Sequence, residues 1–65
     1  MTTNEIIKEM RLKYKLTQKQ LAEITSIPKR TIENWDANKA KPSDYMPNLI
    51  EARLKEYFKN NEENL

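Results

Sequence analysis

The chain contains no cysteine, no histidine and no glycine. Without cysteine, no disulfide and no thiolate metal site can stabilise the fold. Without histidine, the residue that most often binds metals and acts as a general base is missing. The lack of glycine disfavours tight β-hairpins, phosphate-binding loops and Rossmann-type turns. The Lys, Glu, Leu and Asn that dominate instead are typical of an all-α protein. We therefore expect an all-α protein that is not an enzyme, with no catalytic residue, metal, cofactor or small-molecule ligand.

Long apolar runs are also missing. None approaches the roughly 20 residues that span a membrane, and the start, MTTNEIIKEM, lacks the basic beginning and apolar run of a signal peptide. A cytoplasmic protein is the simplest expectation. The 65 residues make one domain at most, and such a short chain has a small core. We expect the domain to span residues 1–59 and a polar tail, residues 60–65, to fray.

Positive charge is concentrated in one part of the chain. From Lys8 to Lys41 there are nine bases and four acids, whereas acids outnumber bases from Pro42 onward. A part of the chain with such an excess of positive charge is typical of proteins that bind nucleic acid. A solvated helical surface explains the same surplus equally well, so charge alone does not decide.

Two helices are predicted at the ends of the chain. Thr2 and Glu5 have the spacing of a capping pair at the start of the first helix. This helix ends without a glycine, so we expect Lys15 to adopt the left-handed conformation at a cost of about 1 kcal/mol. For the last helix, Ser43 is a candidate cap. Either Pro47 lies in the first turn of this helix or the helix begins near Met46, and in both cases it is predicted to run to about Lys59.

Residues 17–38 predict two short helices joined by a tight turn. Thr17 can cap the first helix, with Gln20 three residues later reaching back to the N–H of the cap. Pro28 has no N–H and a fixed φ, so it ends one helix and starts the next. The second helix is expected over residues 29–37.

This pattern resembles the helix-turn-helix of the Cro/lambda-repressor-like family, also called the XRE family, over roughly residues 6–54. Gln18 opens the first helix as in the family, whereas Ser26 and Asn38 stand where the family usually has glycine. The resemblance implies a compact lambda-repressor-like domain of four helices, or five, with a central helix-turn-helix. The side chains implied to form the core of the motif are Leu21, Ala22, Ile27, Ile32 and Trp35.

The resemblance also implies that the second helix enters the major groove of double-stranded DNA, with its N-terminal residues at base edges. The base-reading candidates are Lys29, Arg30, Thr31 and Asn34. Glu33 can accept from cytosine, but offsetting Lys29 on the helix surface is the favoured interpretation. The expected phosphate contacts are Gln18, Lys19, Lys39 and Lys41.

Arg11 has two interpretations. From the family's habit of pairing residues at these sites, we expect Arg11 to form a partly buried ion pair with Asp36 and to hold the end of the recognition helix. A phosphate contact by Arg11 is the alternative.

The leading hypothesis is a sequence-specific DNA-binding regulator, a repressor of a bacterium, phage or mobile element. It is expected to act as a homodimer, formed in solution or only on DNA. Apolar side chains on the last helix exceed what the core needs and are the candidate dimer or partner surface: Leu54, Tyr57 and Phe58. The alternative function is a protein-interaction module or inhibitor that acts through this surface. RNA binding lacks the exposed aromatic platform that unstacked bases require.

Overall fold

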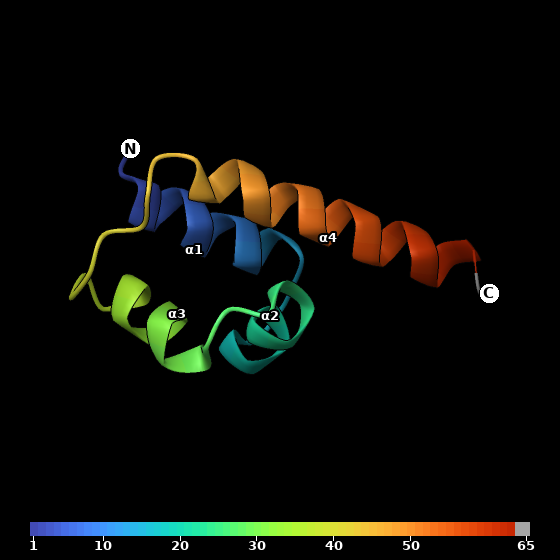
Figure 1. The fold of residues 1–65 in the computed structure, drawn as a ribbon, viewed down its shortest axis with the longest axis horizontal. Helices are drawn as coiled ribbons and strands as arrows, with labels where there is room; N and C mark the ends of the chain where they lie inside the picture. Colours follow the sequence, from blue (N-terminus) through green and yellow to red (C-terminus); the bar gives the residue numbers. More distant parts are fainter. Residues whose placement is uncertain (64–65) are drawn as a thin grey trace.

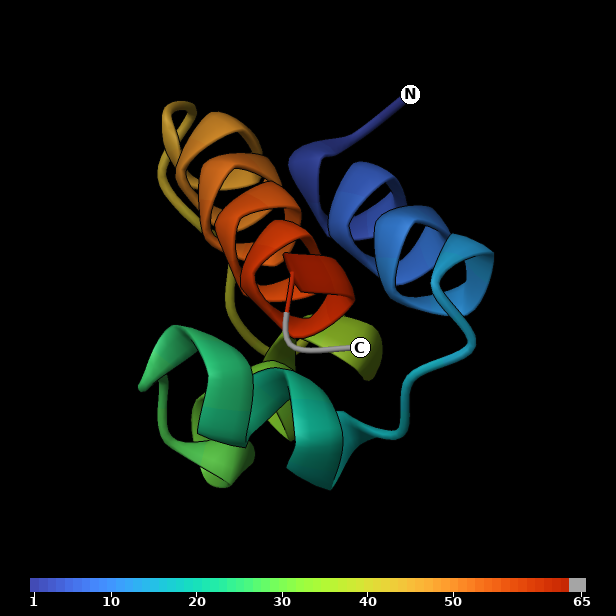
Figure 2. The same cartoon turned by 90° about the vertical axis from the view of Figure 1, so that its right-hand side faces the viewer.

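The computed structural model of the chain describes residues 1–63, with side chains up to Asn60, and has four α-helices in that range. They are α1 (Thr3–Lys13), α2 (Gln18–Thr25), α3 (Lys29–Asp36) and α4 (Met46–Glu63). α1 and α4 lie side by side in one layer, and α2 and α3 form a second layer packed against it (Figures 1 and 2). The predicted all-α fold with a central helix-turn-helix is confirmed, with four helices over the described residues.

Both predicted capping boxes are present. At α1, the Glu5 backbone N–H donates to Thr2 Oγ1 (3.1 Å), and the Thr2 N–H donates to Glu5 Oε1 (3.4 Å). At α2, the corresponding bonds between Gln20 and Thr17 are 3.1 and 2.8 Å long. Each box satisfies N–H groups that a helix start leaves without an intrahelical partner. The local sequence therefore determines where these two helices begin.

Three helix ends use a non-glycine residue in the left-handed region: Lys15 (φ 57°), Ser26 (φ 62°) and Asn38 (φ 59°). After α1, the Leu16 N–H donates to the Arg11 carbonyl (3.1 Å). After α3, the Lys39 N–H donates to the Asn34 carbonyl (2.8 Å). This is the Schellman closure, which usually places glycine at the left-handed position. Asparagine tolerates this conformation better than lysine or serine does. The predicted left-handed Lys15 is confirmed.

Replacing Lys15 by glycine is therefore expected to raise the free energy of unfolding by about 1 kcal/mol, since only glycine adopts this conformation without a steric penalty. Thermal or urea unfolding measures the change. Lys8→Gly is the matched control, because Lys8 is exposed in the interior of α1 and glycine in a helix interior costs about 1 kcal/mol. If neither substitution stabilised the protein, or if both did, a steric penalty specific to the left-handed Lys15 would be contradicted.

A single core receives side chains from all four helices: Ile7, Leu21, Ile32, Trp35, Ile50 and Leu54. Of the predicted motif core, Leu21, Ile32 and Trp35 are buried, and Ala22 and Ile27 pack at its edge. Leu54 is 0% exposed, so its prediction as part of a dimer or partner surface is wrong. The face of α4 that carries it packs against α1 and α2, which makes Leu54 necessary for the core.

α4 begins at Met46 and continues to Glu63, four residues beyond the predicted end near Lys59. Residues 59–63 contain neither proline nor glycine, so nothing in the local sequence stops the helix. The predicted boundary between domain and tail, at residues 59 and 60, thus falls within α4. Fraying of this end stays a prediction, and residues 64–65 lie outside the described residues.

Candidate nucleic-acid interface

The turn between α2 and α3 is built from local hydrogen bonds. Thr25 Oγ1 donates to the Leu21 carbonyl (2.7 Å) and accepts from the Ile27 N–H (3.4 Å). Ser26 then takes the left-handed conformation, and Pro28 stands at the N-cap of α3 without a side-chain cap. The predicted helix-turn-helix is therefore present at the predicted place.

α3 has one buried face and one exposed face. Ile32 and Trp35 lie in the core, whereas Lys29, Arg30 and Glu33 are exposed. Thr31 and Asn34 are half-buried at the borders between the two faces. The four base-reading candidates therefore differ in solvent exposure, and Lys29 and Arg30 are the most accessible of them. Within residues 1–63, Glu33 forms no ion pair with Lys29.

A polar network holds the C-terminal end of α3. Arg11 Nη2 lies 3.4 Å from Asp36 Oδ2, and the Arg11 and Asp36 side chains are only 14% and 10% exposed. Arg11 Nη1 also donates to the Leu16 carbonyl (2.8 Å). The predicted pairing of Arg11 and Asp36 is thus present, and it links α1 to the end of α3.

Gln18 extends this network. Its Nε2 donates to Asp36 Oδ2 (2.8 Å), so one carboxylate oxygen accepts from both Gln18 and Arg11. The contact is not bidentate: Arg11 Nε and Asp36 Oδ1 are buried without a hydrogen-bond partner among the described residues. Because its amide is engaged in this way, Gln18 has a role in holding α2 against α3 that the sequence did not indicate. The expected phosphate contact is left to its backbone N–H, which α2 does not use.

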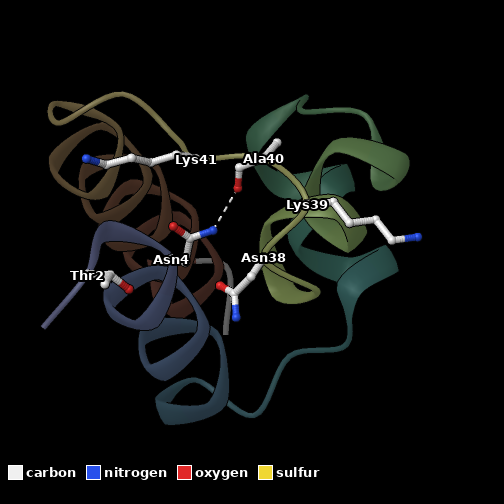
Figure 3. A pocket seen from close by; sticks show the side chains of 6 residues that line it. All are labelled: Thr2, Asn4, Asn38, Lys39, Ala40 and Lys41. Atoms are coloured by element: carbon white, nitrogen blue, oxygen red, sulfur yellow. Dashed lines mark hydrogen bonds between the residues drawn. The ribbon is translucent and has the colours of Figure 1, made fainter.

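The other phosphate candidates lie on two segments, the start of α2 and the loop after α3. Lys19 is exposed in the first turn of α2, next to Gln18. Lys39 and Lys41 are exposed in the loop that leaves α3. Their side chains diverge from either side of Ala40 (Figure 3). These lysines therefore do not form a single cluster.

Asn4 is a contact residue that the sequence gave no reason to select. Its Nδ2 donates to the Trp35 carbonyl (3.0 Å) and to the Ala40 carbonyl (2.8 Å; Figure 3). Asn4 also lines a depression of about 310 Å³ with residues of the loop. No local pattern predicts a bond across more than thirty residues of chain.

The aromatic side chains of α4 differ in exposure. Phe58 is half-buried and stacks on Tyr14, with ring centroids 5.2 Å apart and an interplanar angle of 8°. Tyr57 meets Phe58 edge-on and is 43% exposed. It lines a depression of about 330 Å³ with Gln20, Glu23 and Ile24 of α2. Of the predicted partner surface, Tyr57 is therefore the most accessible residue.

The charged pair on the surface of α4 lies outside this interface. Glu51 Oε1 and Lys55 Nζ are 2.8 Å apart, one helical turn from each other. The hydrogen bond from Lys55 lowers the pKa of Glu51, and Glu51 in turn raises the pKa of Lys55. Among the described residues, no group of three or more metal-binding side chains comes together. Nor is any helix of residues 1–63 long and apolar enough to cross a membrane.

Comparison with known proteins adds one match. The sequence profile of a helix-turn-helix family matches residues 7–46, from the core of α1 through the start of α4. No curated protein and no solved structure gives a significant match.

Proposed function

The chain belongs to the Cro/C1-type helix-turn-helix family, the XRE family of DNA-binding proteins, and from this premise we propose that it is a sequence-specific transcriptional regulator. α3 enters the major groove of double-stranded DNA with its N-terminal turn at the base edges. One observation carries the proposal: the basic face of α3 is exposed while its opposite face is buried in the core. A recognition helix has to be held rigidly in this way to place its side chains in register with the bases.

Specificity comes from the exposed turn of α3. Arg30 or Lys29 donates to guanine O6 and N7, and Asn34 pairs with adenine N6 and N7. Thr31 contacts a thymine methyl group or a phosphate. The half-buried position of Asn34 supports a contact at the border of the groove-facing surface. Lys19, Lys39, Lys41 and the backbone N–H of Gln18 bind phosphates and so orient the domain.

The regulator acts as a homodimer on a two-fold operator, formed in solution or on the DNA. A single domain of this size offers a small interface, and a second copy doubles the contacts. Tyr57, with Phe58 behind it, is the proposed dimer surface. A repressor in the cytoplasm of a bacterial or phage-infected cell is the setting that the family favours.

Selection from a random duplex library tests the proposal. We expect enrichment of a palindromic motif whose half-site spacing locates the dimer axis. Arg30→Ala and Asn34→Ala are each expected to reduce discrimination at particular base pairs by about 1–3 kcal/mol, because each removes a bidentate contact. Binding is measured on the selected site and on its single-base variants.

Lys13→Ala is the matched control, since Lys13 is exposed at the end of α1, outside α3 and the proposed dimer surface. It should leave the base preferences unchanged. The absence of any enriched motif, with only weak binding that salt abolishes, would contradict a sequence-specific regulator.

A protein-interaction module on the same fold is the second candidate, favoured by the exposed Tyr57 beside the depression between α2 and α4. In that function, the chain inhibits a protein partner through this surface and contacts DNA weakly. Loss of activity in Tyr57→Ala with full activity in Arg30→Ala distinguishes this candidate from the first.

A further inference from the structure

Asn4 occupies a position that the start of α1 fixes. Thr2 is the N-cap and Glu5 the third helical residue of the capping box, so Asn4 lies between the two residues that define the helix start. Its side chain therefore leaves α1 from a backbone already held by hydrogen bonds. The side-chain amide has two N–H donors, and each of them binds one carbonyl: that of Trp35 at 3.0 Å and that of Ala40 at 2.8 Å.

The two carbonyls belong to different segments, the end of α3 and the loop that follows it. The Trp35 carbonyl lies in the last turn of α3 and also accepts from the Asn38 N–H (3.1 Å). The Ala40 carbonyl lies in the loop after α3, between Lys39 and Lys41 (Figure 3). One amide thus joins the end of the recognition helix to the segment that carries two phosphate-binding candidates.

The loop has few other attachments to α1. Pro42 is buried, and Thr3 Oγ1 donates to its carbonyl at 3.5 Å, a long contact. Ala40 and its two neighbouring lysines are exposed. The Asn4 bond is consequently the shorter of the two side-chain bonds from α1 to this loop, and it acts at the residue between the lysines.

We propose that Asn4 is a positioning residue for DNA-backbone binding, which it serves by fixing the loop that presents Lys39 and Lys41 to phosphates. The inference rests on the proposed function and adds the residue that sets the geometry of this phosphate contact. Fixing the loop in advance reduces the conformational entropy that is lost when the two lysines bind. Because the same amide holds α3, it also fixes the phosphate contacts relative to the base-reading turn.

A merely structural role for Asn4 predicts a different result. Such a residue would change the free energy of unfolding and leave the number of phosphate contacts in the folded protein unchanged. The salt dependence of DNA affinity counts those contacts, since each phosphate neutralised adds about 0.9 to the slope of log K against log salt concentration. The slope therefore distinguishes positioning from simple stabilisation.

The experiment measures this slope on a duplex of mixed sequence, so that it needs no known operator. Asn4→Asp replaces the donating NH2 by an oxygen that repels both carbonyls, and Asn4→Ala removes the amide without adding charge. Asn48→Asp is the matched control, because Asn48 is exposed near the start of α4 and the substitution changes the net charge equally. Circular dichroism verifies that each variant is folded under the binding conditions.

We expect Lys39→Ala/Lys41→Ala to lower the slope by about two and Asn4→Ala to lower it by about one, while Asn48→Asp changes it far less than Asn4→Asp. Adding Asn4→Ala to the double lysine variant should cause no further loss, because the lysines it positions are gone.

Three results would overturn the inference, and the first two separate it from the proposed function. If Lys39→Ala/Lys41→Ala lowers the slope and Asn4→Ala does not, the lysines bind phosphates but Asn4 does not position them. If Lys39→Ala/Lys41→Ala leaves the slope unchanged, or if the wild-type chain binds no duplex, the proposed phosphate contacts are wrong, and so is the role of Asn4. An equal loss from Asn4→Ala in the presence and absence of the lysines would also contradict it.

Discussion

An Asp36→Ala chain is expected to lose about 3 kcal/mol of unfolding free energy, because removing one partner of a buried ion pair leaves the other charge uncompensated. Arg11 is only 14% exposed and loses its carboxylate, and the Gln18 amide loses its acceptor in the same change. Urea denaturation followed by circular dichroism measures the difference. A domain of this size is stabilised by roughly 3–10 kcal/mol in total, so the substitution should remove between about a third and all of its stability.

The surface pair of α4 provides the control for burial. Glu51 and Lys55 are closer together, at 2.8 Å against 3.4 Å for Asp36 and Arg11. They are nevertheless much more exposed, so water and salt screen them. Glu51→Gln should therefore leave the denaturation midpoint unchanged, despite the shorter distance.

Replacing both partners tests the origin of the loss. Arg11→Met combined with Asp36→Leu removes the uncompensated charge and should be more stable than Asp36→Ala alone. A double variant as unstable as the sum of its single variants would show that the two side chains contribute independently and contradict a coupled pair.

Leu54→Ala is expected to cost about 3 kcal/mol, the typical loss for a leucine truncated in a core. Leu54 is fully buried and packs with Ile50 in the core cluster. The substitution removes the contacts of the deleted methyl groups and leaves a cavity that the helices fill only in part. Thermal and urea unfolding give the change in free energy.

Tyr57→Ala, three residues further along α4, is the matched comparison. Tyr57 is 43% exposed and meets Phe58 edge-on, so its truncation should cost about 1 kcal/mol, clearly less than the truncation of Leu54. If the two substitutions had equal effects on stability, the division of α4 into a core residue and an accessible residue would be wrong.

The elements that sequence predicted best depend on neighbouring residues. A capping box needs residues three positions apart, and both boxes formed where Thr2 and Thr17 indicated. Because no glycine follows α1, the sequence predicted a left-handed conformation at Lys15, and Lys15 adopts it. The pairing of Arg11 with Asp36 followed from a resemblance rather than from local spacing, since 25 residues separate them.

The errors concern how far the helices reach and what covers them. Helical periodicity placed Leu54 and Tyr57 on the same apolar stripe of α4, but periodicity gives the angle around a helix and not the position along the core. The C-terminal part of α4 extends beyond α1 (Figure 1), so residues on one stripe differ in burial. The hydrogen bonds of Asn4 and Gln18 to other helices and loops were missed because their partners lie 18 to 36 residues away.

The buried face of α3 also gives the protein an internal optical reporter. Trp35 is the one tryptophan in the chain and is 6% exposed. Unfolding transfers its indole from an apolar core into water, whose dipoles relax around the excited state and shift the emission to longer wavelengths. DNA is proposed to meet the opposite face of the same helix, so binding need not disturb this signal. Intrinsic fluorescence can therefore follow folding while DNA is present, without an added label.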